Sequence, residues 1–109
     1  MPARDPFTVL ADPTRRRILD LLREQDLMVS ELVDLLRTAQ PNVSKHLKVL
    51  DEAHLVNARV DGPRRHYALV SEPLRELDQW LEPYRRTWAG RLDALEAHLD
   101  EMTDDEGES

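Results

Sequence analysis

Apolar residues recur at steps of three and four over most of this chain, which is the spacing of one face of an α-helix. The pattern predicts helices over residues 13–24, 30–36, 40–53 and about 73–102. Asp12 suits the N-cap of the first helix, because Pro13 follows it at a position where a missing N–H costs nothing. The second and third helices are separated by only three residues. Two short helices with so short a connection predict a helix-turn-helix.

The periodicity changes between the third and fourth helices. Residues 55–60 and 66–70 are β-prone runs with partial alternation, and residues 61–65 between them supply turn residues and two cations. This pattern predicts a β-hairpin. A helix-turn-helix followed by a hairpin is a winged helix, so we expect a mainly α fold with a small β-hairpin wing over residues 57–70.

The predicted helix over residues 40–53 has two faces of different chemistry. Val43, Leu47 and Leu50 fall at i, i+4 and i+7 and form an apolar stripe. The polar side chains that point elsewhere are Gln40, Asn42, Ser44, Lys45 and Lys48. Amides can pair with adenine, hydroxyls with a base or a phosphate, and lysines with backbone charge. We interpret this helix as a recognition helix for DNA; the alternative is an ordinary amphipathic helix with a solvated polar face.

The last predicted helix carries a near-heptad apolar seam from Leu74 to Met102. A seam of this length exceeds what a small domain needs for its own core, so it predicts a partner helix rather than packing within one chain. A two-fold homodimer would place two recognition helices about 34 Å apart on one side of DNA. The residues expected at the dimer interface are Leu77, Leu81, Tyr84, Trp88, Leu92, Leu95 and Leu99.

Two features mark the limits of this helix. Pro83 removes one backbone hydrogen bond, so we expect a kink or break between about Gln79 and Pro83. Residues 103–109 have the composition of a disordered acidic tail. We therefore expect a winged-helix domain over residues 1–102, which includes the dimerisation helix, and a tail over 103–109.

The net charge of −7 is unevenly distributed, because residues 93–109 hold eight acidic side chains and no Lys or Arg. Residues 37–67 hold six cations against three anions. Screening at physiological salt confines each charge to about 8 Å, so the local excess of cations matters more for DNA than the total. The acidic total therefore does not exclude nucleic acid as a partner.

Composition excludes several other classes of protein. The 109 residues support one small domain, and the absence of cysteine excludes disulfides and thiolate metal sites. The apolar runs are too short for a membrane span or a signal peptide, which predicts a cytoplasmic protein. No phosphate loop, buried carboxylate pair or cofactor motif is present, so we expect neither an enzyme nor a bound cofactor.

Several motifs resemble the ArsR/SmtB family of bacterial winged-helix repressors. They are residues 12–19 (Asp-Pro-Thr-Arg-Arg-Arg-Ile-Leu), residues 30–32 (Ser-Glu-Leu), residues 40–50 (Gln-Pro-Asn-Val-Ser-Lys-His-Leu-Lys-Val-Leu) and residues 53–56 (Ala-His-Leu-Val). Residues 73–88 are similar to the carboxy-terminal helix of the SdpR-like branch, whose members act as autorepressors without an obvious metal site. The resemblance thus extends over nearly the whole chain and implies a DNA-binding repressor.

The resemblance also implies roles for individual residues. It places Gln40, Asn42, Ser44, Lys45 and His46 toward the major groove, and the wing residues Arg64 and Arg65 on the backbone or the minor groove. Arginine suits a narrow minor groove, where the negative potential is enhanced. Family members pair their first and last helices across a dimer, which agrees with the seam.

The chain departs from the family pattern at three places. Ala39 stands where members usually have Ser, so the recognition helix loses a preferred cap unless Thr38 replaces it. His54 stands where many members have Gly, at a position expected to need a positive φ. The Cys-x-Cys of metal-sensing members is absent from the first helix of the helix-turn-helix.

Two other functions and two ambiguous motifs stay open. His98 and Glu101, at i and i+3, form half of another family metal site and are weak candidates for zinc ligands. A metal- or ligand-responsive sensor of the same fold could bind a ligand between Trp80, Tyr84 and Trp88. The simpler interpretation is that these rings are part of a hydrophobic core. A winged-helix module could instead bind protein. The triple arginine at residues 15–17 could contact phosphate or pair with neighbouring carboxylates.

Overall fold

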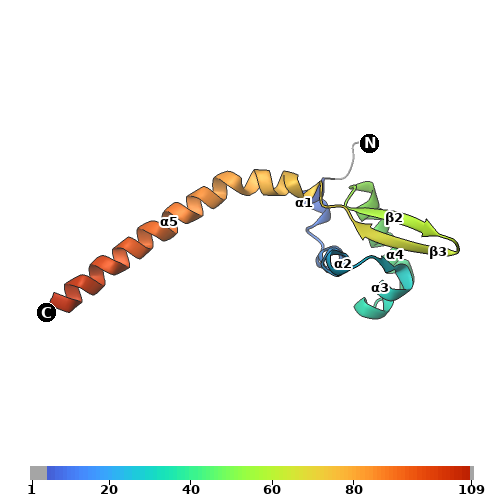
Figure 1. Ribbon diagram of the computed structural model, residues 1–109, viewed down its shortest axis with the longest axis horizontal. Coiled ribbons are helices and arrows are strands. Elements are labelled where there is room, and N and C mark those ends of the chain that lie inside the picture. The colour runs from blue at the N-terminus through green and yellow to red at the C-terminus, as the bar shows by residue number, and fades with distance from the viewer. Residues whose placement is uncertain (1–4, 109) are drawn as a thin grey trace. The chain divides into compact units, whose positions relative to one another are not determined.

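The computed structural model describes residues 5–108, with side chains described as far as Met102 (Figure 1). In chain order the elements are α1 (Pro6–Val9), α2 (Pro13–Glu24), β1 (Leu27–Met28), α3 (Val29–Leu36), α4 (Gln40–Glu52), β2 (Val56–Asp61), β3 (Arg64–Leu69) and α5 (Leu74–Glu108). The expected winged helix is confirmed. The chain divides into two compact units, one up to Leu77 and one from Asp78 onward, whereas a single domain through residue 102 was expected.

The start of α2 follows the sequence prediction. Asp12 is its N-cap, and the carboxylate accepts hydrogen bonds from the backbone N–H groups of Thr14 at 2.8 Å and Arg15 at 3.2 Å. Pro13 occupies the first turn, where its missing N–H leaves no bond unmade. The helix ends at Glu24, as predicted.

Two of the three arginines at the start of α2 bind backbone rather than carboxylates. The Arg15 Nε donates to the Val9 carbonyl at 2.7 Å, and the Arg16 Nη1 donates to the carbonyls of Leu10 at 2.7 Å and Ala11 at 3.2 Å. These carbonyls end α1 and the turn after it, where cations are favourable. Of the two alternatives that the sequence left open, phosphate contact or pairing with neighbouring carboxylates, the second is therefore not what holds the Arg15 and Arg16 side chains.

The helix-turn-helix consists of α3 and α4. Arg37 ends α3 in the left-handed conformation, with φ 53°. Ala39 precedes α4 without a side-chain cap. The Thr38 hydroxyl does not replace that cap, because it donates to the Leu36 carbonyl at 3.1 Å. His54, just after α4, has φ 60°, so the expected positive φ is confirmed.

The wing is the antiparallel hairpin of β2 and β3, shown as the yellow-green arrows in Figure 1. Its strands reach Asp61 and Arg64, which are paired in register, so the five-residue connection predicted over 61–65 is wrong. The turn needs only Gly62 and Pro63 because Gly62 adopts φ +61°, which glycine tolerates, and proline then fixes a negative φ. This sign order is that of a type II′ hairpin turn.

A third strand, which the sequence did not predict, completes the sheet. β1 pairs with β3, with Leu27 opposite Tyr67 and Met28 opposite His66, so the strand order is β1-β3-β2. The Met28 backbone N–H also donates to Glu31 Oε1 at 2.9 Å at the start of α3. This short strand therefore ties the helix-turn-helix to the wing.

The core of the first unit lies where the helical stripes and the sheet meet. The predicted stripe of α4 is buried, with Val43 and Leu50 each 0% exposed, and Ile18 on α2 is also 0% exposed. The full set of buried apolar residues is Val9, Ile18, Leu19, Leu22, Leu27, Leu32, Leu36, Val43, Leu47, Leu50, Ala53, Leu55 and Val56. Burial of these side chains orients α4 because it fixes which of its faces points inward.

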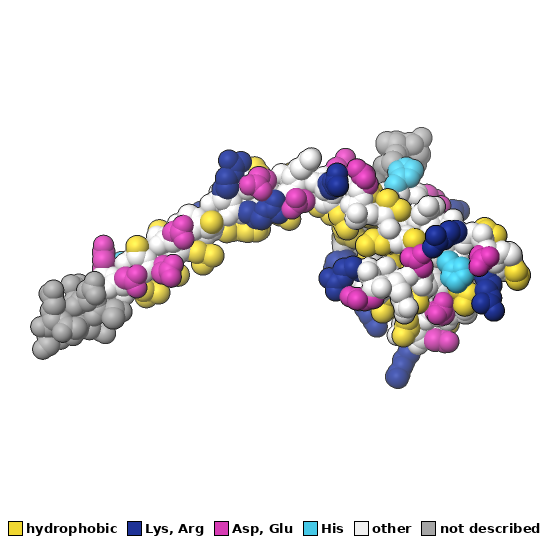
Figure 2. All heavy atoms as spheres, in the orientation of Figure 1, with side chains coloured by type: hydrophobic (Ala, Val, Ile, Leu, Met, Phe, Trp, Pro, Cys, Tyr) yellow, Lys and Arg dark blue, Asp and Glu magenta, His cyan; other side chains and the backbone are white. Residues whose placement is uncertain are grey.

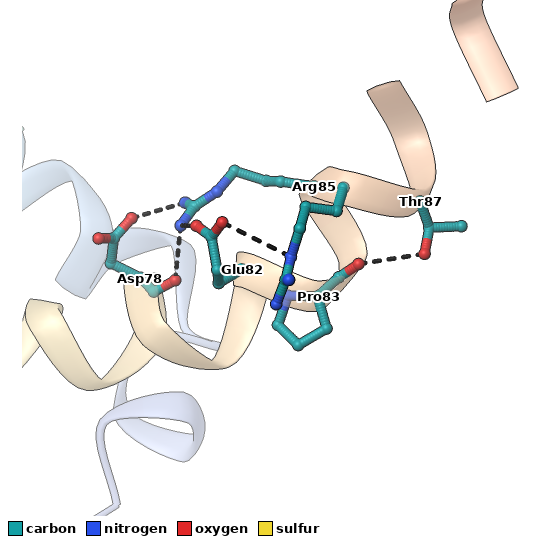
Figure 3. Close-up of polar contacts among 6 residues, drawn as sticks. Asp78, Glu82, Pro83, Arg85 and Thr87 are labelled. Atoms are coloured by element: carbon teal, nitrogen blue, oxygen red, sulfur yellow. Dashed lines mark hydrogen bonds and ion pairs between the residues drawn. The ribbon is translucent and has the colours of Figure 1, made fainter. Parts of the chain in front are cut away.

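α5 is one continuous helix with Pro83 inside it, so the proline does not break it. The helix also continues to Glu108, past the end predicted at residue 102. Around the proline, the Thr87 hydroxyl donates to the Pro83 carbonyl at 3.1 Å, and Arg85 Nη2 bonds Glu82 Oε2 at 2.8 Å (Figure 3). These side chains supply polar contacts in the turn where the ring removes a backbone donor. Ser109 lies outside the described residues.

Candidate nucleic-acid interface

The outward face of α4 is polar and solvent-exposed. Opposite the buried Val43, Leu47 and Leu50, the helix exposes Gln40, Asn42, Ser44, Lys45 and Lys48. Within the described part of the chain, none of these five side chains makes a hydrogen bond or an ion pair. The face therefore offers two amides, one hydroxyl and two ammonium groups that an external partner can use. We call these five residues the α4 polar face.

His46 lies at the edge of this face rather than on it. Its side chain is only partly exposed, and its Nδ1 atom is buried without a hydrogen-bond partner among the described residues. It interacts electrostatically with Asp12 at the start of α2. Of the major-groove residues implied by the family resemblance, His46 is thus the one that packing partly withdraws from solvent.

Asp12, at the start of α2, has a lowered pKa. Partial desolvation acts to raise the pKa of Asp12, but it is outweighed by hydrogen bonds from the N–H groups of Arg15 and Thr14 and by the charges of His46 and Arg15. The pKa of Asp12 therefore lies below its ordinary value of 3.8. The carboxylate stays ionised and continues to cap α2 next to α4.

The two wing arginines project from opposite faces of the hairpin. Neighbouring residues of a strand alternate in direction, so Arg64 shares a face with its partner Asp61, and Arg65 shares the other with Val60. Both arginines are exposed. Within the described residues neither forms an ion pair, so both guanidinium groups are available to a phosphate.

Arg59, the third cation of the wing, is engaged inside the chain. Its Nη2 forms a hydrogen-bonded ion pair with Asp26 Oδ2, in the connection between α2 and β1. The sequence did not predict this pair, because the partners lie 33 positions apart and no local spacing connects them. The pair joins strand β2 of the wing to the connection between α2 and β1.

The second unit presents an exposed apolar stripe along α5. Figure 2 shows its yellow side chains along one edge of the helix, with magenta carboxylates among them. Exposed fractions include 51% for Trp88, 64% for Leu92 and 54% for Leu95, whereas Leu77 and Leu81 are partly buried. Members of what we call the α5 stripe are Trp80, Leu81, Tyr84, Trp88, Leu92, Leu95, Leu99 and Met102. The Trp80 and Tyr84 rings lie 4.7 Å apart between centroids.

The candidate metal ligands His98 and Glu101 are both exposed on α5. Within the described part of the chain, no group of three or more His, Asp or Glu side chains could hold a metal ion. The two residues alone would leave zinc with fewer than its usual four ligands. In the same range of residues, no helix is long and apolar enough to cross a membrane.

A helix-turn-helix with a β-hairpin wing and an exposed polar second helix defines the class of winged-helix DNA-binding regulators. The sequence model of the family described as "Bacterial regulatory protein, arsR family" matches residues 12–58, which include α2, the helix-turn-helix and the start of the wing. SdpR of Bacillus subtilis (strain 168), named a transcriptional repressor, is 31% identical over 75 residues, or 69% of this chain and 83% of that protein.

Two further similarities cover more of the chain. Rv2034 of Mycobacterium tuberculosis (strain ATCC 25618 / H37Rv), named an HTH-type transcriptional regulator, is 41% identical over 99 residues, or 91% of this chain and 90% of that protein. The crystal structure of the ArsR family transcriptional regulator RHA00566 matches with a TM-score of 0.67 at 32% identity, covering 76% of this chain and 91% of that one.

The chain belongs to the arsR family of bacterial regulatory proteins, and the resemblance seen in its motifs is confirmed. It is a DNA-binding transcriptional regulator and not an enzyme.

Proposed function

We propose that the chain is a homodimeric repressor that binds a pseudo-palindromic DNA operator. The observation that carries this proposal is the α4 polar face, which is exposed and makes no intrachain bonds among the described residues. Lys45 and Lys48 would bind phosphates, while Gln40, Asn42 and Ser44 would reach base edges in the major groove. Arg64 and Arg65 would contact the backbone or the minor groove on either side of the wing.

The dimer would form through the α5 stripe. A row of exposed large apolar side chains is unfavourable in water, and burial of each such side chain contributes roughly 1.5–3 kcal/mol. A second copy supplies an identical stripe and therefore a self-complementary interface. Two copies of α4 would then read two half-sites, which gives the operator its approximate symmetry.

Repression would follow from occupancy of the operator, because a bound dimer excludes polymerase from an overlapping promoter. The relative SdpR is named a transcriptional repressor, which supports the direction of control. The promoter of its own gene is the first operator to test, and the cytoplasm is where such a protein would meet bacterial DNA.

The test is fluorescence anisotropy of labelled DNA from the upstream region of the gene, with a scrambled duplex as control and a series of salt concentrations. We expect preferential binding to the upstream DNA, with log affinity falling linearly as log salt rises, because bound cations release counterions. If the protein shows no preference for the upstream DNA at any salt concentration, the operator lies elsewhere in the genome. If the affinity for DNA does not change with salt concentration, the α4 polar face does not bind phosphates as proposed, and a protein partner is favoured.

Substitutions test whether the α4 polar face and the wing bind DNA. Lys45→Ala with Arg65→Ala should weaken operator binding roughly tenfold or more and flatten the salt dependence. The matched control is Arg23→Ala with Arg86→Ala, which removes two exposed cations outside the α4 polar face and the wing. Equal effects of the two double variants would show that only total charge matters.

A parallel titration with zinc tests His98 and Glu101, and release of DNA by zinc would indicate a metal-responsive repressor.

A further inference from the structure

A surface pocket in the first unit is lined by side chains from four segments of the chain. Its apolar lining consists of Leu10 after α1, Leu19 on α2, Leu69 at the end of β3 and Leu74 at the start of α5. Leu19 is buried, and the other three leucines are half-buried. We call this the α2 pocket. Its volume of about 290 Å³ lies at the small end of the range for ligand sites, so it suits an apolar body no larger than one big side chain.

Three charged side chains of α2 line the same pocket, namely Arg16, Asp20 and Arg23. They follow one another at i, i+4 and i+7, so they form one row along the helix. Arg23 already has a partner, because its Nη2 contacts Glu24 Oε1 at 3.2 Å. Asp20 is exposed and makes no hydrogen bond or ion pair with any residue that the structure describes. The row therefore presents one carboxylate that is available to an external cation.

Arg16 is fixed at the other end of this row. Its Nη1 donates to the Leu10 carbonyl at 2.7 Å and to the Ala11 carbonyl at 3.2 Å. These two bonds orient the guanidinium plane, while Nε and Nη2, the two donors of its other edge, bond no atom among the described residues. A carboxylate that binds this edge loses little side-chain entropy, because the guanidinium is already held in place. The pocket thus offers a preorganised cation one helical turn from an unpaired anion.

We propose that the α2 pocket binds a free α-amino acid with a large apolar side chain. The carboxylate of the ligand accepts from Nε and Nη2 of Arg16, its ammonium group donates to Asp20, and its side chain packs against the four leucines. A zwitterion fits better than a fatty acid, because Asp20 repels a lone anion, and better than an apolar amine, because Arg16 repels a lone cation. The proposal is independent of the homodimer and the operator, since all the lining residues belong to one chain and none to the α4 polar face.

Isothermal titration calorimetry of the full chain tests the proposal with L-leucine as the probe. Two compounds with the same branched apolar body serve as comparators: 4-methylpentanoate lacks the ammonium group, and 3-methylbutylamine lacks the carboxylate. We expect one leucine to bind per chain, and each comparator to bind roughly tenfold more weakly or worse, because it leaves one charge of the pocket without a partner.

The comparators also give the results that would overturn the proposal. If 4-methylpentanoate binds as tightly as leucine, Asp20 contributes nothing and the pocket is a site for simple carboxylates. If 3-methylbutylamine binds as tightly as leucine, Arg16 contributes nothing and the pocket is a site for amines. If none of the three compounds binds, the pocket takes no small ligand of this class and is left to a side chain of a protein partner.

Substitution of Asp20 assigns the binding to this pocket. Asp20→Asn keeps the size of the side chain and removes its charge, and the exposed position makes no contribution to the core. We expect the affinity for leucine to fall roughly tenfold, while the affinity for 4-methylpentanoate stays the same or rises, because a repulsive charge has been removed. The matched control is Asp34→Asn, at an exposed position on α3 that does not line the pocket. Equal effects of the two variants would overturn the assignment.

A second pair of variants tests the other end of the row. Arg16→Gln should abolish the preference for leucine over 3-methylbutylamine, and Arg17→Gln, which changes an exposed neighbour outside the pocket, should keep it. Because Arg16 also bonds the end of α1, circular dichroism first establishes that the Arg16→Gln chain is folded. If that variant does not fold, the Asp20→Asn comparison decides the question alone. A folded Arg16→Gln chain that binds leucine as the natural chain does would overturn the proposal.

Discussion

Arg85 reaches back seven positions along α5 and donates to Asp78 twice, to the carboxylate at 2.6 Å and to the main-chain carbonyl at 2.8 Å. Pro83 lies between the two residues and supplies no N–H for the carbonyl four positions earlier. The guanidinium thus adds side-chain bonds across the turn that the proline weakens. Hydrogen bonds to Glu82 and Asp78 raise the pKa of Arg85 further, so the group stays charged.

Loss of the Arg85 bonds should therefore weaken the helix and, through it, the dimer. We expect Arg85→Ala to lower the helical circular dichroism signal and to raise the dimer dissociation constant by a few-fold, measured by sedimentation. The change is modest because the ion pairs are partly exposed to water. Arg86→Ala is the control, since Arg86 has only one long contact with Glu82, at 3.8 Å. Equal effects of both variants would show that the contacts with Asp78 are unimportant.

The missing cap before α4 predicts a stabilising substitution. Ala39→Ser would place a hydroxyl at the N-cap, where it can accept from the Asn42 N–H, which now donates only to the Ala39 carbonyl at 3.1 Å. We expect the free energy of unfolding to rise by about 1 kcal/mol, which is roughly 4–8 °C in Tm for a unit of this size. Thermal denaturation with Ala89→Ser, inside α5, as a control separates capping from a general effect of serine. A Tm that does not rise would mean that the backbone at residue 39 cannot present the hydroxyl.

The features that could be predicted from the sequence depend on residues close together in the chain. The start of α2 follows from Asp12 and Pro13, and the buried stripe of α4 follows from helical spacing alone. The positive φ at His54 was expected from the family resemblance, because many members have Gly at this position. The α4 polar face followed from the same spacing, because a helix with one buried stripe must expose the opposite side.

The features that were missed depend on distant residues. Strand β1 forms because Leu27 lies opposite Tyr67, and the pair of Arg59 with Asp26 spans a similar gap. Neither segment shows a periodicity that reveals its partner. The withdrawal of His46 from the polar face has the same origin, since it depends on the neighbouring start of α2. Local patterns therefore predict the helices and their faces. The three-stranded sheet and the position of His46 at the edge of the α4 polar face become visible only in the folded structure.

The lowered pKa of Asp12 predicts an acid-dependent loss of stability. A carboxyl whose folded pKa lies below its unfolded value stabilises the native state above the unfolded value, and this contribution is lost as pH falls through the folded pKa. The relevant window thus begins near the ordinary value of 3.8 and extends below it. Asp12→Asn keeps the capping oxygen but cannot titrate, so its stability should vary less with pH in this window.

Urea denaturation between pH 5 and pH 2 checks this expectation. The control is Asp20→Asn, because Asp20 is exposed on the same helix and does not cap it. The difference between wild type and Asp12→Asn should narrow as the pH falls, whereas Asp20→Asn should follow the wild-type curve. Parallel curves for wild type and Asp12→Asn would show that the cap does not depend on the ionised carboxylate.

A charge within the α5 stripe should separate dimerisation from folding. Leu92 is 64% exposed, so Leu92→Asp removes no core contact of the single chain, but in a dimer it would bury a carboxylate against apolar side chains. We expect a monomer by light scattering, with weak operator binding because only one half-site can be held at a time. Ala97→Asp is the control, since Ala97 lies on the far side of the helix and should leave the dimer intact. Unfolding curves of both variants should match the wild type in the first unit, where the core resides. A Leu92→Asp protein that stays dimeric and binds DNA normally would exclude the α5 stripe as the dimer interface.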